Sequence, residues 1–484
     1  MSDERIDLVV LGGGTAGLVA AHGAAGLGAQ VVMVEPNHPG GDCLWHGCVP
    51  SKRILSAAKV AHTMRVSAAK HGITPVEPEI DFAAVMATVR TAQDSIAHHD
   101  SVERLENAGV RVIPALGRLT GKNTIEAAGE TLTFRKAMLA VGAKPSVPPI
   151  PGLREANPLT SDTVWDLDEA PKRLAVIGGG AIGCELGQAF SRLGSAVTIF
   201  EFADRLLPFL NDNVGDLIGE RFTAEGIDVR SGVGVTNVEE NADGSYTLSF
   251  GEGDAAGSVI VDQILAATGR APNTRDIGLE EAGVEVDKRG LVVVNDRLQT
   301  SNPHIYAGGD VVGKMPFTHT AGAHGSAVVA NALFGLRRKV DHDNIPFAIF
   351  CDPEVASIGK IEGDADDSEF VTHHLDHDQL DRAVTSGEPI GFIDLFVDDG
   401  KLVGATVVGE TAGETINEMT LRVNSKAKLR DIGQMIRPYP TFAESSAKAA
   451  NEALREQFFS PKVRRLTQPV LSLLDRVDHA EDGD

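Results

Sequence analysis

Two stretches of this sequence repeat one pattern, in which an apolar run leads into Gly-x-Gly-x-x-Gly and then into a run of small residues. The first is DLVVLGGGTAG (Asp7–Gly17) and the second is RLAVIGGGAIG (Arg173–Gly183). In both copies a further apolar run follows and ends in an acid, Glu35 or Glu201, 23 residues after the first glycine. Strand, glycine turn, helix and strand in this order predict a βαβ unit that binds a dinucleotide.

The three glycines of each copy have separate physical tasks. The first allows a tight turn, the second lets a pyrophosphate approach the backbone, and the third lets helix and strand pack closely. They are Gly12, Gly14 and Gly17 in the first copy and Gly178, Gly180 and Gly183 in the second. One match alone would equally fit a structural turn, but two complete copies indicate two bound dinucleotides.

The acid of the second copy also indicates which nicotinamide dinucleotide binds. Glu201 can accept a hydrogen bond from the ribose 2′-hydroxyl of NAD, and its charge would repel the 2′-phosphate of NADP. The first arginine after this acid is Arg205, so no cation stands directly beside it in the sequence. The sequence therefore favours NADH over NADPH.

Length and charge narrow the classes of partner. The chain has 484 residues, more than one compact core usually serves, so several domains are expected. Its formal net charge of −24 opposes binding to nucleic acid or to an anionic membrane and favours a small-molecule partner. The opening MSDERIDLVVLGGG leaves no room for a signal peptide, and no apolar run is long enough to span a bilayer. We expect a cytoplasmic protein.

The stretch GGDCLWHGCVPSK (residues 40–52) contains two of the four cysteines, Cys43 and Cys48. A zinc half-site and a chance pair of buried thiols are alternatives, but no second pair of ligands stands at matching spacing. Pro50 favours a helix that starts just after Cys48, and the helix N-terminus and Lys52 would stabilise the Cys48 thiolate. Two dinucleotides and a close thiol pair predict an electron relay, with FAD at the first site and a nicotinamide at the second.

This stretch resembles the redox loop of the class I pyridine nucleotide-disulfide oxidoreductases, the family of dihydrolipoamide dehydrogenase, glutathione reductase and mercuric reductase. ATGRAPN, YAGGD, DPEVASIG and YPTFAE also occur in the family's order, so the resemblance covers nearly the whole chain. It implies an α/β fold with two Rossmann-like domains, for FAD and NAD, and a C-terminal α+β dimerisation domain. The expected boundaries are an FAD-binding domain over 1–150, an NAD-binding domain over 151–272, a central segment that completes the FAD domain over 273–346, an interface domain over 347–460 and a tail over 461–484.

The resemblance also implies roles for individual residues. Cys43 would meet the acceptor and Cys48 would contact the flavin, with Lys52 near the flavin and paired with Glu185. Tyr439 and Glu444 complete the expected catalytic set. The other residues expected to bind the cofactors are Gly12, Gly14, Thr15, Ala16, Gly17, Glu35, Gly41, Asp42, Gly117, Gly142, Gly178, Gly180, Ala181, Ile182, Gly183, Glu201, Val235, Gly269, Arg270, Asp310, Thr318 and His319. The family completes each active site with C-terminal residues of the partner subunit, so a homodimer is expected, with no metal site.

Two positions depart from the family pattern. Disulfide-reducing members carry His-Pro-Thr-x-x-Glu near the C-terminus, whereas RPYPTFAE places Tyr439 where they have histidine. Tyrosine titrates near 10 and is a poor base at neutral pH. Mercuric reductases also have tyrosine there, but they end in a cysteine pair that this sequence lacks. The second departure is Trp45-His46 in the redox loop, where His46 is either a substitute base or, as we favour, a loop histidine that is exposed or bonded to the backbone.

The sequence therefore predicts an FAD-dependent oxidoreductase that passes electrons from NADH through Cys43 and Cys48 to a metal ion, a quinone or a small disulfide. Dihydrolipoamide dehydrogenase, which works in the opposite direction, is the nearest alternative. A flavoprotein with a binding or regulatory role is an alternative of another class.

Other segments carry structural expectations. GFIDLFVDDGKLVGATVVG predicts an antiparallel hairpin around an Asp-Asp-Gly turn. We expect Cys184 and Cys351 to be small buried residues, with Cys351 at the start of a strand. The segment Ser460–Val477 puts cations before an apolar-periodic stretch, which could contact a membrane or a partner, although a helix packed on its own dimer is the expectation.

Overall fold

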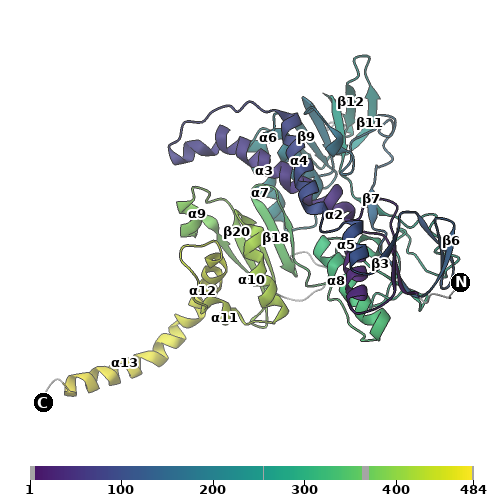
Figure 1. Ribbon diagram of the computed structural model, residues 1–484. Helices are drawn as coiled ribbons and strands as arrows, with labels where there is room; N and C mark the ends of the chain where they lie inside the picture. The colour runs from purple at the N-terminus through teal and green to yellow at the C-terminus, as the bar shows by residue number, and fades with distance from the viewer. Residues whose placement is uncertain (1–5, 254–255, 362–369, 482–484) are drawn as a thin grey trace. The chain divides into compact units, whose positions relative to one another are not determined.

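A computed structural model describes residues 6–253, 256–361 and 370–481 of the chain. The chain divides into two compact units, Met1–Ile345 and Pro346–Asp484 (Figure 1). The first contains parallel sheets covered by helices, and the second contains an antiparallel sheet with helices of its own. The predicted α/β fold class is confirmed.

The N-terminal sheet of the first unit is built around β1 (Ile6–Leu11). The strand order is β3-β2-β1-β6-β5-β4, and β16 also pairs with β6. Strands β3, β2, β1, β6 and β16 are parallel, whereas β5 and β4 continue the sheet antiparallel. Their bounds are β2 (Val31–Val34), β3 (Val110–Ile113), β4 (Gly117–Gly121), β5 (Thr124–Ala127), β6 (Glu130–Leu139) and β16 (Ile305–Ala307).

Helices α1 (Thr15–Gly26) and α8 (Thr318–Phe334) pack together against this sheet. Their buried alanines and small apolar residues allow close contact with the strands. The redox loop forms α2 (Gly41–Trp45) and the start of α3 (Cys48–Arg65). The other helices of this part are η1 (Ser67–His71), α4 (Phe82–Ala97), α5 (Val102–Asn107) and η4 (Asp310–Val312).

A second parallel sheet in the same unit has the order β10-β9-β8-β14. Its strands are β8 (Arg173–Ile177), β9 (Ala196–Glu201), β10 (Asp228–Ser231) and β14 (Gln263–Ala266), with helices α6 (Ala181–Arg192) and α7 (Asp212–Ala224). A three-stranded antiparallel sheet is formed by β11 (Val235–Glu240), β12 (Tyr246–Phe250) and β13 (Gly257–Val261). The remaining elements are the antiparallel pair β7 (Ala143–Pro145) and β15 (Arg270–Pro272), and η2 (Val164–Asp166).

The first glycine of each fingerprint adopts a backbone conformation that favours glycine. The φ angle is 105° at Gly12 and 111° at Gly178. A Cβ atom would lie 2.3 Å from the carbonyl oxygen of Ala140 at the first position and 2.5 Å from that of Ala267 at the second. The third glycine is equally confined, since a Cβ at Gly17 would lie 2.0 Å from the carbonyl oxygen of Gly12. The predicted tight turn and close packing are confirmed.

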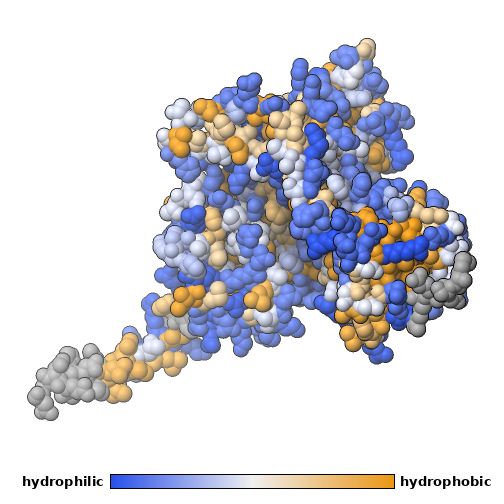
Figure 2. Space-filling model, in the orientation of Figure 1, coloured by the Kyte–Doolittle hydropathy of each residue, from blue (hydrophilic) through white to orange (hydrophobic). Residues whose placement is uncertain are grey.

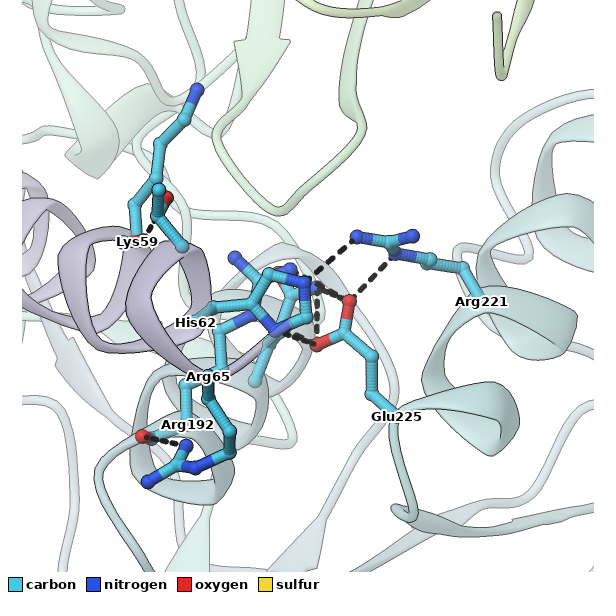
Figure 3. A network of polar contacts seen from close by, with 8 residues as sticks. Lys59, His62, Arg65, Arg192, Arg221 and Glu225 are labelled. Atoms are coloured by element: carbon cyan, nitrogen blue, oxygen red, sulfur yellow. Dashed lines mark hydrogen bonds and ion pairs between the residues drawn. The ribbon is translucent and has the colours of Figure 1, made fainter. Parts of the chain in front are cut away.

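A network of charged side chains joins α3 to α6 and α7 (Figure 3). Arg192 donates to both carboxylate oxygens of Glu225, at 2.7 and 2.6 Å, and Arg221 lies 2.6 Å from the same carboxylate. Arg221 also lies 3.3 Å from the ring of His62, and Arg65 donates to the carbonyl oxygen of Arg192 at 3.0 Å. Buried charges are tolerated when they are paired in this way. The network fixes α3, which begins in the redox loop, against the second sheet's helices.

The second unit is built on a five-stranded antiparallel sheet with the order β17-β18-β21-β20-β19. The strands are β17 (Phe347–Ile349), β18 (Glu354–Gly359), β19 (Val371–Asp376), β20 (Phe392–Asp398) and β21 (Lys401–Gly409). The predicted hairpin is confirmed as β20 and β21. The helices are η5 (His377–Gln379), α9 (Asp381–Thr385), α10 (Ala412–Asn424), α11 (Leu429–Gly433), α12 (Glu444–Phe458) and α13 (Pro461–Glu481).

The two remaining cysteines are both buried, as predicted. Cys184 is on α6, where its thiol donates to the carbonyl oxygen of Gly179 at 3.3 Å. Cys351 does not start a strand, because it lies in the turn between β17 and β18. Its thiol donates to the carbonyl oxygen of Pro353 at 3.3 Å, and this local contact belongs to a turn.

Candidate functional site

The first glycine loop forms a cradle for an anion at the start of α1. The N-cap is Gly14, which has no side chain to accept hydrogen bonds from the first turn of the helix. A Cβ atom at Gly14 would meet only the Cα of Gly41, at 3.9 Å, so the backbone is open to close approach. Glu35 at the end of β2 accepts a hydrogen bond from the backbone N of Gly13 at 2.5 Å. This cradle fits the pyrophosphate of a dinucleotide such as FAD.

The second glycine loop has the same construction at the start of α6. Its N-cap is Gly180, which again has no side-chain cap, and a Cβ atom there would meet no other atom within 4 Å. Glu201 at the end of β9 accepts hydrogen bonds from the backbone N of Gly179 at 2.7 Å and of Ala203 at 2.8 Å. These bonds hold the carboxylate beside the loop, which fits a nicotinamide dinucleotide whose ribose meets this acid.

The other expected cofactor residues lie at strand ends and helix starts of the first unit. They are Thr15 and Ala16 in the first turn of α1, Ala181, Ile182 and Gly183 in the first turn of α6, Gly117 at the start of β4, Gly142 after β6, Val235 at the start of β11, Gly269 after β14, and His319 in the first turn of α8. Gly142 and Gly269 both have positive φ angles, 65° and 112°. Strand ends that terminate in glycine allow a ligand to approach the backbone.

The two redox-loop thiols lie on consecutive helices, a short one and the start of a long one. Cys43 is inside α2, and Cys48 is the first residue of α3, where the orphan N–H groups of a helix N-terminus favour a thiolate. The Cys48 sulfur lies 3.2 Å from the hydroxyl oxygen of Thr318, the first residue of α8.

The electrostatics of the pair distinguish the two thiols. A hydrogen bond from Cys43, one from Thr318 and the charge of Lys52 lower the pKa of the Cys48 thiol to about 6, although burial acts in the opposite direction. The hydrogen bond to Cys48 and burial raise the pKa of the Cys43 thiol well above its usual value. Both shifts favour the negative charge on Cys48 and the proton on Cys43 when the pair is reduced.

Lys52 connects the redox helix to the second glycine loop. Its ammonium donates to the carboxylate of Glu185 at 2.8 Å, and the Glu185 side chain is buried in α6. Glu185 lies only two residues after the last fingerprint glycine, Gly183. The expected pair is present, and it places one cation beside both the Cys48 thiol and the helix that follows the second glycine loop.

Arg270 joins the redox loop to the start of η4. Its guanidinium lies 3.0 Å from the carboxylate of Asp42, the residue before Cys43, and 3.8 Å from that of Asp310. Burial raises the pKa of Asp310, and the charge of Arg270 partly offsets this increase. The sequence indicated each of these residues separately, but their ion pairs arise because the fold brings three distant segments together.

The backbone of the redox loop is held by two side chains that sequence reasoning missed. Gln93 of α4 donates to the carbonyl oxygen of Trp45 at 2.8 Å, and Trp165 of η2 donates to that of His46 at 2.8 Å. No local sequence signal marks either residue, since a single glutamine or tryptophan has many roles. His46 itself is half-buried, and its Nδ1 atom has no hydrogen-bond partner among the described residues.

Tyr439 and Glu444 lie in the second unit. The Tyr439 hydroxyl donates to the carboxylate of Asp381 at 2.7 Å, and Lys448 donates to the other oxygen of this carboxylate at 3.1 Å. The hydrogen bond and the charge of Asp381 raise the pKa of the Tyr439 phenol above its usual value. Glu444 accepts from the backbone N of Thr441 at 3.1 Å, at the start of α12. Asp381 was not foreseen, because it precedes Tyr439 by 58 residues.

We expect Asp381→Asn to lower the pKa of the Tyr439 phenol, because the negative charge that opposes its ionisation is removed. A spectrophotometric titration of tyrosinate absorption measures this shift, and the chain has only three tyrosines. Tyr439→Phe is the matched control, since the titration step assigned to Tyr439 must be missing from it. An unchanged midpoint in Asp381→Asn would show that the two side chains do not interact in solution.

The described part of the chain contains neither a cluster of metal ligands nor a helix that could span a membrane. No group of three or more histidine, cysteine, aspartate or glutamate side chains is placed to hold a metal ion. Among those same residues, no helix combines the length and apolar character needed to cross a bilayer.

The chain is similar to a known protein family, to proteins of known name and to a solved structure. Residues 6–325 match the family model described as "Pyridine nucleotide-disulphide oxidoreductase", and residues 345–450 match that family's dimerisation domain. A mercuric reductase of Staphylococcus aureus is 36% identical over 453 residues, which cover 93% of this chain and 82% of that protein. Dihydrolipoyl dehydrogenase 2 of Haloarcula marismortui is 33% identical over 464 residues, covering 93% and 97%. The solved structure of LpdA from Mycobacterium tuberculosis has a TM-score of 0.84 at 25% identity, covering 93% of this chain and 100% of that chain.

Proposed function

The chain belongs to the pyridine nucleotide-disulphide oxidoreductase family, and we propose that it passes electrons from NADH to an acceptor that takes them without a proton. A metal ion fits this requirement better than a small disulfide, and so does a quinone that is reduced one electron at a time to its semiquinone anion. Its relatives are FAD-dependent enzymes that use pyridine nucleotides. FAD, when bound, accepts a hydride from the nicotinamide and transfers the electrons to the thiol pair.

We assign the FAD-binding part to residues 1–150 and 273–346, the NAD-binding part to 151–272, the interface domain to 347–460 and the tail to 461–484. The return of β16 to the N-terminal sheet supports the division of the FAD part into two segments. The match of residues 345–450 to a dimerisation domain indicates a homodimer. Tyr439 and Glu444 belong to this domain, and we assign them to the active site of the partner subunit.

The two thiols of the pair support different roles in electron transfer. Cys48 is the thiol that carries the negative charge, because the helix N-terminus, Thr318 and Lys52 stabilise its thiolate. Cys43 retains its proton in the reduced pair and is the thiol that we assign to the acceptor. Lys52 is fixed by Glu185, so its charge stays close to Cys48 while the pair cycles between dithiol and disulfide.

The hydrogen bond from Tyr439 to Asp381 is the observation that carries the choice of acceptor. When a disulfide is reduced, the departing thiolate leaves best if a neighbouring group gives it a proton and regains one in each cycle. A phenol whose pKa lies above its usual value of about 10 gives up its proton reluctantly. An acceptor that needs only electrons is not limited in this way.

Dihydrolipoamide dehydrogenase activity is the second candidate, because a relative with that name matches over 97% of its own length. It requires the same proton transfer in reverse, so the Tyr439 hydrogen bond argues against it. A binding or regulatory flavoprotein is the third candidate, and the intact cysteine pair argues against that role.

A screen of acceptors under NADH, with NADPH in parallel, distinguishes these candidates. The holoenzyme should reduce a quinone or a thiol-complexed divalent metal ion faster than it reduces a glutathione-type disulfide or lipoamide. Brisk turnover of lipoamide would instead establish the dehydrogenase. Slow turnover with every acceptor would favour the binding or regulatory role.

We expect Glu201→Ala to reduce the preference for NADH over NADPH about tenfold, since hydrogen bonds to charged groups are worth about 1.5–3 kcal/mol. The variant loses both the acceptor for the ribose hydroxyl and the charge that repels a phosphate. The ratio of kcat/KM for the two nucleotides measures this change. Glu35→Ala is the matched control, because it alters the equivalent acid of the other loop and should leave the ratio unchanged. A ratio that Glu201→Ala does not alter would show that Glu201 does not contact the ribose.

A further inference from the structure

Helix α13 (Pro461–Glu481) carries an apolar face that its own unit does not cover. Five of its large side chains are exposed by more than half: Leu466, Val470, Leu471, Leu473 and Leu474. In Figure 1 this helix extends away from the sheet of the second unit, and Figure 2 shows apolar side chains gathered along it. A contiguous apolar face of this kind marks an interaction surface.

The spacing of these residues specifies a kind of partner. Val463, Leu466, Val470 and Leu473 follow one another at intervals of three, four and three residues, and the sequence continues the pattern with Val477 four residues later. This three-four spacing matches the heptad repeat of a coiled coil, with valine at the a positions and leucine at the d positions. Leu471 and Leu474 fall at b and e and widen the apolar face on either side of this seam. Among parallel coiled coils, a β-branched residue at a with leucine at d favours two strands.

We propose that α13 pairs in parallel and in register with α13 of a second copy of this chain. The region matched by the dimerisation domain ends at residue 450, eleven residues before α13 begins, so the helix continues directly from an interface between copies. A two-fold axis that runs along the helices brings identical residues of the two copies opposite each other. The pair thus extends the dimer beyond the domain that the family shares.

The dimerisation domain holds the two copies of α13 close together, and this tethering accounts for the stability of so short a coiled coil. Most of the stability of a helix comes from the packing of its apolar face, and Pro469 weakens α13 because proline donates no hydrogen bond inside a helix. Pro469 lies at a g position, beside the seam, so it does not replace a residue of the apolar contact. Two copies already held together by the dimerisation domain meet at high effective concentration, which favours pairing without strong affinity.

A membrane surface is the competing occupant, because Lys462, Arg464 and Arg465 stand at the start of the helix. Basic residues before an apolar face are typical of helices that lie on anionic lipid. The net charge of −24 opposes this binding, and a lipid surface does not require the three-four alternation of valine and leucine. The observations therefore favour a second copy.

Cysteine cross-linking in the full-length holoenzyme tests the proposal. Leu473→Cys places a thiol in the seam, where a parallel in-register pair brings it against its own copy, whereas Ser472→Cys places one on the neighbouring c position. Under mild oxidation, we expect Leu473→Cys to run as a covalent dimer on a non-reducing denaturing gel and Ser472→Cys to remain largely monomeric. Neither residue contacts the core, so both variants should fold, and NADH oxidation with the chosen acceptor verifies this.

Two further measurements complete the test. Adding Pro469→Ala to Leu473→Cys should speed cross-linking, because the helix regains a hydrogen bond. Equal cross-linking at both positions, or none at Leu473→Cys, would overturn the proposal. Sedimentation of wild type with phosphatidylserine vesicles, lost in Leu466→Asp, would assign the apolar face to a membrane and would also overturn it.

Discussion

Cys43→Ser should retain FAD, lose turnover by about 10³-fold or more, and show a long-wavelength absorption band in its resting state. The loss of turnover follows because the thiol that meets the acceptor is replaced by an unreactive hydroxyl. The band follows because Cys48 remains as a lone thiolate that no longer can form a disulfide. An absorption spectrum of the purified variant and its NADH-dependent turnover measure both effects.

The pH dependence of this band has a defined direction. The band arises from charge transfer from the thiolate to oxidised FAD. It is therefore present above the pKa of Cys48 and disappears as the pH falls below it. In the wild-type reduced pair this pKa is about 6, and the hydrogen bond from Cys43 is the largest cause of its low value. Because a serine hydroxyl can also donate, we expect Cys43→Ser to keep a midpoint close to this value.

Cys43→Ala is the matched variant, since alanine cannot donate a hydrogen bond to Cys48. Its midpoint should lie above that of Cys43→Ser, because burial raises the pKa of Cys48 and only Thr318, Lys52 and the helix N-terminus then oppose it. Cys48→Ser should show no band at any pH. A band in Cys48→Ser with none in Cys43→Ser would mean that the roles of the two thiols are reversed.

The nucleotide cradles could be predicted from sequence because their physical causes are local. Gly12 and Gly178 are required by positive φ angles within one turn, and Glu35 and Glu201 reach the adjacent loop from the next strand. Each of these features lies within about 25 residues of sequence, in a single βαβ unit. A local sequence pattern is therefore enough to predict the geometry of each glycine loop.

Contacts between distant segments could not be predicted in this way. Gln93 donates to the backbone of Trp45, 48 positions earlier in the chain. Tyr439 donates to Asp381, 58 positions earlier. Glutamine and aspartate are common on helices and in turns, so neither residue type singles out such a contact. The pair of Lys52 and Glu185 was foreseen only through family resemblance, because 133 residues separate its partners.

The sequence also left the proton-transfer group open between Tyr439 and His46. The structure argues against Tyr439 as an efficient general acid and base, because Asp381 raises the pKa of its phenol. His46 lies half-buried at the C-terminus of α2, and only its backbone carbonyl is bound by Trp165. The choice of acceptor therefore depends on a proton that Tyr439 retains, and substitutions at positions 439 and 46 test this directly.

We expect Tyr439→His to raise the turnover of small disulfides by about 10²-fold, the lower end of what general acid and base catalysis usually contributes. An imidazole titrates near 6.5 and can give up and regain a proton at neutral pH, whereas the wild-type phenol retains its proton. The carboxylate of Asp381, which accepts from the phenol in wild type, would also stabilise an imidazolium and raise its pKa. Disulfide turnover should therefore acquire a new ionisation at or above pH 6.5, seen in the pH profile of kcat/KM.

Tyr439→Phe is the control for this gain, because it removes the hydroxyl and adds no titrating group. It should leave disulfide turnover low and turnover of a quinone nearly unchanged, so that a gain found only in Tyr439→His is attributable to the imidazole. The opposing result is a wild type that already reduces a disulfide briskly, with an ionisation in the histidine range that is lost in His46→Ala. In that case the loop histidine transfers the proton, and the preference for a metal ion or a quinone loses its physical basis.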